Sequence, residues 1–242
     1  MENAAEEHLV GGNNAEQVVR IGDTVHRSRD YRSAFAADVL CYLESVGYAY
    51  APRYLGIDDQ GRDVLSYISG NTTDHPSQRA DGAYARAGMM LRQLHEATAG
   101  HALAGDRDCV VHGDAGPFNT VFQDGHPVAF IDWTGCAPGA RLDDLGYLAW
   151  SWCIQTTGNV PIDDQAAHLR ELRDGYGDVD PEQLLDAMIR QQTRIVDLET
   201  VNLHDPRFSP TRRAHARRAI TWADSDRDLI RRHHALLLSA LR

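Results

Sequence analysis

The sequence predicts an α+β protein in which a small antiparallel sheet with one helix precedes a larger, mainly helical part. Up to Gly70, short apolar runs alternate with turn residues, as in antiparallel strands. After Gly70, apolar residues recur at the three- and four-residue spacing of helices. One hairpin pattern, in residues 110–133, interrupts the helical part. We therefore expect two lobes, residues 1–69 and residues 70–242.

The first lobe is expected to contain five strands and one helix. Three strands joined by Gly-Asn-Asn and Gly-Asp turns are predicted in the runs HLVGG, EQVVRIG and TVHRS. The helix is predicted in YRSAFAADVLCYLESVG, where the apolar residues Phe35, Val39, Leu40 and Leu43 recur at three and four and Gly47 is suited to end it. Two further strands, PRYLGID and RDVLSYI, flank the turn residues DQG.

The second lobe is expected to be built from helices around the hairpin. In AYARAGMMLRQLHEAT, Met90, Leu91 and Leu94 lie on one side. Further helices are predicted in LDDLGYLAWSWCI, DQAAHLRELRDGYG, PEQLLDAMIRQQTRIVDLET and the Arg-rich tail.

The hairpin is expected to bring polar side chains together at its open end. With a turn centred on Asp124 and Gly125, antiparallel pairing places Val121 opposite Val128 and Asn119 beside residues 130–132. Asp132 therefore converges with Asn119. Asp114 lies a short loop upstream of Asn119, so a second carboxylate stands nearby.

These three side chains suit phosphoryl transfer. One carboxylate and one amide oxygen, with room for water and phosphate oxygens, match the octahedral oxygen shell that Mg²⁺ prefers. The remaining Asp can accept a proton from a hydroxyl nucleophile. Asx-type turn residues are the simpler alternative for the same pattern.

The motifs HGDAGPFN (112–119), IDW (131–133) and DDLGYLA (143–149) resemble the aminoglycoside phosphotransferases and their choline kinase-like relatives, which have a protein-kinase-like fold. The spacing of Asp114 and Asn119 equals the Asp-x-x-x-x-Asn of the kinase catalytic loop, and IDW stands in the place of Asp-Phe-Gly. The combination is much more specific than HGD alone.

The resemblance implies roles for several residues of the second lobe. Asp114 is expected to be the catalytic base, and Asn119 and Asp132 are expected to be the Mg²⁺ ligands. His112 is expected to brace the catalytic loop, with a core histidine as the alternative. Asp144 is expected to support that loop structurally.

The resemblance also implies that residues 1–69 bind the nucleotide, ATP or GTP. VLSYISG looks like the hinge between the lobes, where the carbonyl of Ser66 and the amide of Ile68 would bond the adenine edge; a plain edge strand is the alternative. Gly11 and Gly12 can let backbone amides approach phosphate, although a hairpin turn explains them equally well.

The phosphate-binding Lys of the family cannot exist here, because all 24 basic residues are Arg. Arg27 is the candidate replacement, since Val25 and Arg27 point to the same face of the strand as in the Ala-x-Lys pattern of kinases. A solvated strand residue is the alternative. The helix that should supply an acidic partner offers Asp38 or Glu44, neither of them convincingly placed.

The composition restricts the partners. The net charge of −11 argues against nucleic acid and is compatible with a cationic substrate. No apolar run is long enough for a membrane span, and the acidic start MENAAEEHLV does not resemble a signal peptide, so we expect a cytoplasmic protein. Any subset of seven acidic residues in the helical part can contact ammonium groups of a substrate: Asp163, Asp164, Asp197, Glu199, Asp205, Asp224 and Asp228.

The expected function is therefore that of a Mg²⁺-dependent enzyme that moves the γ-phosphoryl group of ATP or GTP to a hydroxyl of a small molecule. An aminoglycoside or another cationic antibiotic is the leading substrate, which makes antibiotic resistance the expected role. A choline-like or other metabolite hydroxyl, a catalytically silent nucleotide-binding protein and a protein kinase are the alternatives.

Overall fold

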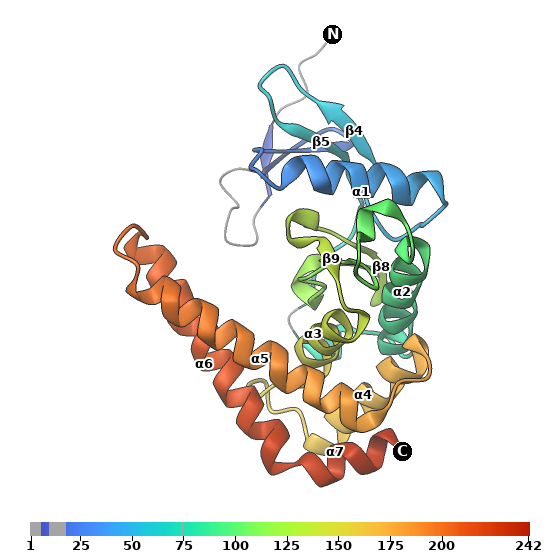
Figure 1. Cartoon of the computed structure of the whole chain (residues 1–242), viewed down its shortest axis with the longest axis vertical. Coiled ribbons are helices and arrows are strands. Elements are labelled where there is room, and N and C mark those ends of the chain that lie inside the picture. The colour runs from blue at the N-terminus through green and yellow to red at the C-terminus, as the bar shows by residue number, and fades with distance from the viewer. Residues whose placement is uncertain (1–5, 10–17, 74) are drawn as a thin grey trace. The chain divides into compact units, whose positions relative to one another are not determined.

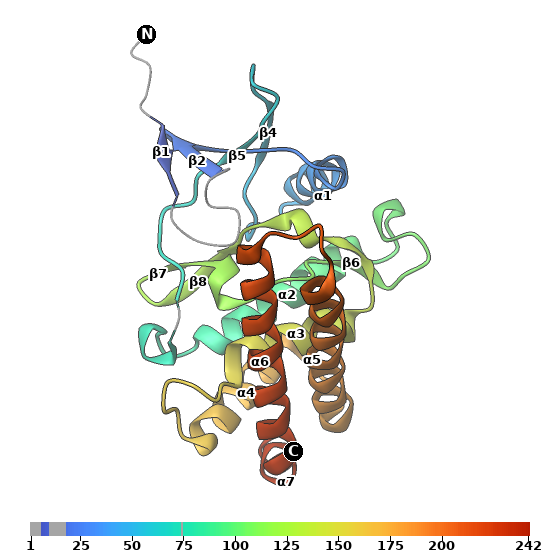
Figure 2. The ribbon, with the colours of Figure 1, turned by 90° about the vertical axis from the view of Figure 1, so that its left-hand side faces the viewer.

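The computed structural model describes residues 6–9, 18–73 and 75–242. The chain divides into two compact units, residues 1–80 with 93–139 and residues 81–92 with 140–242. Figure 1 and Figure 2 show the ribbon in two perpendicular views. The division into functional lobes at residues 69 and 70 stays a prediction.

The first unit contains an antiparallel sheet with the strand order β1-β2-β3-β5-β4 in the described residues. The strands are β1 (Glu7–His8), β2 (Val18–Ile21), β3 (Thr24–Arg27), β4 (Tyr54–Ile57) and β5 (Asp63–Ser66). The order places β3 beside β5, although β4 lies between them in the sequence. In this register Val25 is opposite Leu65 and Arg27 is opposite Asp63.

The predicted helix of this unit is α1 (Ser33–Ser45), which lies against β4 (Figure 1). Of its expected apolar residues, Val39, Leu40 and Leu43 are buried and Phe35 is half-buried. The predicted end at Gly47 is also confirmed: Gly47 has φ +78°, and its amide donates to the carbonyl of Glu44 at 3.1 Å.

The predicted hairpin is formed by β7 (Thr120–Gln123) and β8 (His126–Phe130), with Asp124 and Gly125 at positive φ in the turn. The expected pairing of Val121 with Val128 is wrong. A bulge between Val121 and Phe122 shifts the register, so that Val121 is opposite Ala129. A separate antiparallel pair, β6 (Cys109–Val111) and β9 (Ala137–Gly139), flanks the hairpin in the sequence.

The second unit is helical, as predicted. Its helices are α3 (Arg141–Cys153), α4 (Ile162–Tyr176), α5 (Pro181–His204), α6 (Pro210–Arg232) and α7 (His234–Leu241); residues 81–92 add the first part of α2 (Ala83–Thr98). The expected apolar residues of α2, Met90, Leu91 and Leu94, are buried. Within the described residues, none of the helices combines the length and the apolar character needed to cross a bilayer.

Two hydrogen bonds link α3 and the segment that follows it to α6 in the core of the second unit. The Trp150 indole donates to the buried carboxylate of Asp226 at 3.0 Å, and the amide of Thr156 donates to the same carboxylate at 2.9 Å. Burial raises the pKa of Asp226 despite these hydrogen bonds. The carboxylate is therefore a fully bonded part of the core.

The long helices α5 and α6 run side by side, as both ribbon views show (Figure 1, Figure 2). Glu199 on α5 is buried and accepts two hydrogen bonds from the Arg212 guanidinium on α6, at 2.7 and 2.8 Å. Burial raises the pKa of Glu199, but the Arg212 contacts outweigh it and hold the pKa below its ordinary value. The pair therefore stabilises the α5–α6 contact only while Glu199 is ionised.

Replacing Glu199 with Gln should lower the free energy of unfolding by about 2 kcal/mol at pH 7, because Arg212 loses its charged partner. The pKa of Glu199 is lowered in the folded state. Its contribution is therefore complete above the unfolded pKa and is lost as the pH falls through the folded pKa. Urea unfolding of both proteins across this pH range measures the difference.

Asp197→Asn is the matched control, since Asp197 is an exposed carboxylate of α5 that forms no ion pair among the described residues. Its unfolding free energy should match that of the parent at every pH. A Glu199→Gln penalty that stays constant from pH 7 to well below pH 4.5 would contradict this role of the ion pair.

Candidate functional site

The loop between β6 and β7 holds two of the predicted site residues in contact. The side-chain amide of Asn119 donates to the backbone carbonyl of Asp114 at 3.0 Å and to its carboxylate Oδ2 at 2.9 Å. Asn119 ends a 3-10 turn over Pro117–Asn119, where its own amide donates to the carbonyl of Gly116. The five-residue spacing thus closes a loop that fixes the Asp114 carboxylate.

His112 occupies the buried start of this loop. Its Nδ1 accepts a hydrogen bond from the amide of Asp114 at 3.3 Å, so in the neutral imidazole the proton sits on Nε2. The ring packs against Trp133 and Phe130, with centroid separations of 4.7 and 5.6 Å. The bracing role of His112 stays a prediction.

Gly113 is required by the path of the loop. Its φ is +80°, in the left-handed region, and a Cβ at this position would lie 2.7 Å from the carbonyl oxygen of Gly135. The His-Gly-Asp motif therefore has a steric reason for its middle residue, because the loop passes directly over the chain that follows Asp132.

Asp132 lies next to Asn119 because of the hairpin pairing. The amide of Ile131 donates to the carbonyl of Asn119 at 2.8 Å. Asp132 itself has φ +59° and ψ +67°, a left-handed conformation that is uncommon for residues other than glycine and is concentrated at functional sites. The hydroxyl of Thr134 donates to its Oδ1 at 2.6 Å, and the side chain is 53% exposed.

The donor set of this hairpin fits Mg²⁺. In the described part of the chain, no cluster of three His, Cys, Asp or Glu side chains can hold a metal ion. Asn119 donates both of its hydrogen bonds to Asp114 through its side-chain nitrogen, which turns the amide oxygen away from Asp114. One amide oxygen and one exposed carboxylate leave most of an octahedral shell to water and phosphate, as Mg²⁺ prefers.

Arg27, the predicted substitute for the missing Lys, lies at the same place. It is buried on β3, and its Nη1 is 3.5 Å from Oδ1 of Asp132. The predicted strand face is therefore turned toward the metal-ligand candidate, and the alternative of a solvated strand residue is wrong. The phosphate-binding role stays a prediction.

A further residue of this site, Asp63 on β5, was not predicted from the sequence. Its Oδ2 is 3.8 Å from Nε of Arg27, and its side chain is 1% exposed. Asp63 could have been found only from the pairing of Arg27 with Asp63 across β3 and β5. This pairing joins strands that are not consecutive, so no turn in the sequence sets its register.

The acidic partner expected from the helix is not supplied by either candidate. Asp38 is exposed, and Glu44 forms an ion pair with Arg53 at 2.6 Å. Four of the seven acidic residues in the second unit also have an Arg partner: Glu199 with Arg212, Asp205 with Arg207, Asp224 with Arg227 and Asp228 with Arg231. The negative charge available to a cationic substrate is therefore smaller than the composition indicates.

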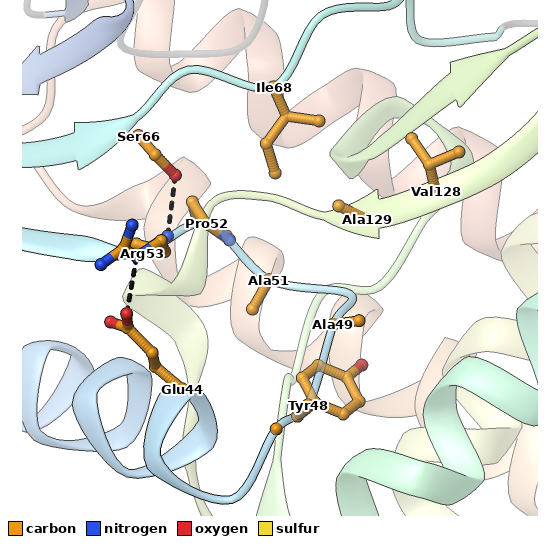
Figure 3. A pocket seen from close by; sticks show the side chains of 11 residues that line it. Glu44, Tyr48, Ala49, Ala51, Pro52, Arg53, Ser66, Ile68, Val128 and Ala129 are labelled. Atoms are coloured by element: carbon orange, nitrogen blue, oxygen red, sulfur yellow. Dashed lines mark hydrogen bonds and ion pairs between the residues drawn. The ribbon is translucent and has the colours of Figure 1, made fainter.

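The predicted hinge residues border a hollow of about 420 Å³ in the first unit (Figure 3). Ser66 accepts a hydrogen bond from the amide of Arg53 at 2.9 Å through its side chain, and its own amide donates to the Arg53 carbonyl. Ile68 and Val128 contribute apolar walls. Neither Arg27 nor Asp132 lines this hollow, and the predicted adenine contacts of Ser66 and Ile68 stay a prediction.

Three predicted residues remain, Gly11, Gly12 and Asp144. Gly11 and Gly12 lie outside the described residues. Asp144 is buried in the first turn of α3, in the second unit. Its support of the catalytic loop stays a prediction.

Comparison with known sequences identifies the chain's relatives. The profile described as "Phosphotransferase enzyme family" matches residues 34–179. A protein of Rhizobium leguminosarum bv. trifolii named trifolitoxin immunity protein is 32% identical over 192 residues, which are 70% of this chain and 73% of that protein.

Solved structures show the same fold. A choline/ethanolamine kinase family protein from Mesorhizobium loti has a TM-score of 0.60 at 20% identity and covers 93% of this chain and 88% of its own. An aminoglycoside phosphotransferase from Streptomyces rimosus, in complex with ADP and streptomycin, has a TM-score of 0.59 at 15% identity. The match covers 77% of this chain and 91% of that protein. The predicted protein-kinase-like α+β fold is confirmed.

Replacing Gly113 with Ala should destabilise the protein by about 3 kcal/mol, from the left-handed conformation and from the clash with Gly135. Gly82→Ala is the matched control, because Gly82 has φ +83° but no atom within 4 Å of its added Cβ. The control should lose only about 1 kcal/mol, the cost of the left-handed conformation alone. Urea unfolding measures both values, and equal losses would show that the contact with Gly135 is not tight.

Proposed function

This chain belongs to the phosphotransferase enzyme family, and we propose that it transfers the γ-phosphoryl group of ATP or GTP to a hydroxyl group of a small molecule. One observation carries the proposal. Asp114 is hydrogen-bonded to Asn119, and Asn119 is paired through the backbone with the residue before Asp132. A base candidate and two metal-ligand candidates are thus held by one loop and one hairpin.

Asp114 is the proposed catalytic base. The hydrogen bond from Asn119 orients the carboxylate, and the backbone contact with His112 fixes the loop that carries it. A carboxylate held in this way accepts the proton of the acceptor hydroxyl as that oxygen attacks the phosphorus. The acceptor oxygen therefore gains nucleophilicity without becoming a free alkoxide.

Asn119 and Asp132 are the proposed ligands of Mg²⁺. When bound, the ion neutralises phosphate charge and aligns the donor for in-line transfer. The amide oxygen of Asn119 and the exposed carboxylate of Asp132 supply the protein oxygens. Thr134 holds Asp132 in orientation through its hydroxyl hydrogen bond.

Arg27 is the proposed phosphate-binding cation. A guanidinium stays charged and donates two parallel hydrogen bonds to phosphate oxygens, whereas an ammonium acts as a point charge. Its distance of 3.5 Å from Asp132 puts it beside the proposed metal position. The chain therefore retains a cation at this place without any Lys.

We propose an antibiotic or toxin with a free hydroxyl as the acceptor, and resistance to that compound as the role. The support is the immunity protein of Rhizobium leguminosarum and the streptomycin complex among the solved structures. The Mesorhizobium loti relative favours a choline-like acceptor as the second candidate. We propose the cytoplasm as the location of the reaction, because nucleoside triphosphates are available there.

Product formation tests the proposal. The protein is incubated with Mg·ATP or Mg·GTP and a panel of aminoglycosides, other hydroxylated antibiotics, choline and ethanolamine, and products are detected by mass spectrometry. Mg²⁺-dependent phosphorylation of an antibiotic supports the proposed role, and phosphorylation of choline alone supports the second candidate. No phosphorylated product from any acceptor, with nucleotide still bound, would favour a catalytically silent protein.

Asp114→Asn should reduce turnover by about 10²-fold or more while leaving the affinity for Mg·ATP within about threefold, because the amide cannot accept the proton. Asp124→Asn is the matched control. Asp124 is an exposed carboxylate in the hairpin turn, where Asn tolerates the positive φ, and it should keep full turnover. Steady-state kinetics and a nucleotide titration measure both effects. Full turnover in Asp114→Asn would refute the assignment of the base.

A further inference from the structure

We propose that Asp63 on β5 is the positioning residue that holds Arg27 for the phosphate groups of the nucleotide. The inference rests on the proposed function, since it assigns the partner of the phosphate-binding cation. The sequence predicted an acidic partner for Arg27 on helix α1, whereas Asp63 lies on a strand of the sheet.

The sheet register brings the two residues together. Arg27 on β3 is directly opposite Asp63 on β5, and directly opposite residues in adjacent strands point to the same face. The pair of half-buried Val25 and buried Leu65, two residues away, lies on that face as well. The contact between Arg27 and Asp63 is therefore built into the pairing of two strands.

Asp63 is itself held firmly. Its Oδ1 accepts a hydrogen bond from Arg29 at 2.5 Å and one from the hydroxyl of Tyr54 at 3.3 Å. Arg29 also donates to the Tyr54 hydroxyl at 3.1 Å, which closes a small network. The other oxygen, Oδ2, is the one that faces Nε of Arg27. One oxygen of Asp63 thus fixes the carboxylate and the second is directed at Arg27.

Arg27 is buried but incompletely bonded. Its Nε and the Oδ2 of Asp63 are both buried atoms without a hydrogen-bond partner in the described residues, and they are 3.8 Å apart. Buried polar atoms without partners are rare and commonly mark a site where a ligand or a small rearrangement completes the bonding. A small shift of the guanidinium would bring Nε within hydrogen-bond distance of Asp63.

The two carboxylates beside Arg27 differ in exposure, and the difference decides their roles. Asp63 is 1% exposed and Asp132 is 53% exposed. Ion pairs are weaker in water than in a desolvated environment, so Asp63 is the permanent partner and Asp132 the exchangeable one. When Asp132 binds metal, Arg27 keeps Asp63 and turns its remaining N–H groups to phosphate.

Helix α1 is not needed for this arrangement. Asp38 on α1 is exposed, and Glu44 is paired with Arg53. Because β3 and β5 are neighbouring strands, the cation and its partner are held whenever the sheet is folded. We therefore expect the phosphate-binding cation to be positioned without any movement of a helix.

The alternative is that Asp63 only neutralises Arg29 and stabilises the sheet. A double-mutant cycle separates the two roles, because a residue that acts through Arg27 has no effect once Arg27 is gone. The dissociation constant of Mg·ADP is measured by isothermal titration calorimetry for the parent, Arg27→Gln, Asp63→Asn and the double variant. Each single change should weaken binding about tenfold, and the double variant should bind no more weakly than Arg27→Gln.

Asp58→Asn is the matched control. Asp58 is a carboxylate next to β4 that bonds His26 at 2.8 Å and Arg62 at 2.7 Å. Because His26 and Arg27 are consecutive on β3, their side chains point to opposite faces, so the loss of Asp58 removes an ion-pair network on the other face of the same sheet. It should lower the urea midpoint and leave the dissociation constant within about twofold. If Asp63→Asn fails to fold, Arg29→Gln is compared with the double variant Arg29→Gln/Asp63→Asn. In this double variant the guanidinium of Arg29 is absent, so the loss of Asp63 does not leave that charge without its partner.

Normal Mg·ADP affinity in Asp63→Asn, or losses that multiply in the double variant, would overturn the inference. Either result leaves the proposed function intact, because the parent protein would still bind nucleotide and form product. A parent protein that binds neither Mg·ADP nor Mg·ATP would instead overturn the proposed function itself.

Discussion

The hydrogen bond from the amide of Ile131 to the carbonyl of Asn119 is the contact on which the candidate site depends. It extends the β7–β8 pairing by one step beyond the strands and ties the end of the loop that carries Asp114 to the residue before Asp132. Asn119 in turn bonds Asp114 through its side chain. A shift of the hairpin register by one residue would turn Asp132 to the opposite face and separate it from Asn119 and Asp114.

The charged side chains around this hairpin differ in their exposure to solvent. Arg27 and Asp63 are enclosed in the sheet, whereas Asp132 is exposed and in a left-handed conformation. The enclosed pair keeps its geometry, and the exposed carboxylate can change partners between a guanidinium and a metal ion. This arrangement explains how a chain without Lys can keep a cation beside the proposed metal site. It also assigns a cost to the site, because a buried guanidinium with incomplete bonding is unfavourable until a ligand completes it.

The parts of the site that the sequence predicts are those set by local rules. The spacing of Asp114 and Asn119 and the Asp-Gly turn define the loop and the hairpin, and the alternation of β3 places Arg27 on the correct face. The bulge beside Val121 could not be predicted, because it depends on how the hairpin packs.

Asp63 could not be predicted for a different reason. Its contact with Arg27 joins β3 to β5, and β4 lies between them in the sequence. Register between strands that share no turn is set by the packing of the whole sheet, for which no short motif exists. The same limit applies to Glu44, whose pairing with Arg53 was decided by the path of the chain after α1.

The central claim is that Asn119 and Asp132 bind a divalent metal together with nucleotide, independently of the proposed base. Mn²⁺ replaces Mg²⁺ in an oxygen site, and the relaxation of water protons reports its binding in the presence of ADP. The account predicts a strong enhancement of the water-proton relaxation rate by Mn²⁺ and ADP in the parent protein and in Asp114→Asn. In Asp132→Ala it predicts a loss of about tenfold or more in Mn²⁺ affinity. Equal Mn²⁺·ADP binding in the parent protein and Asp132→Ala would contradict it.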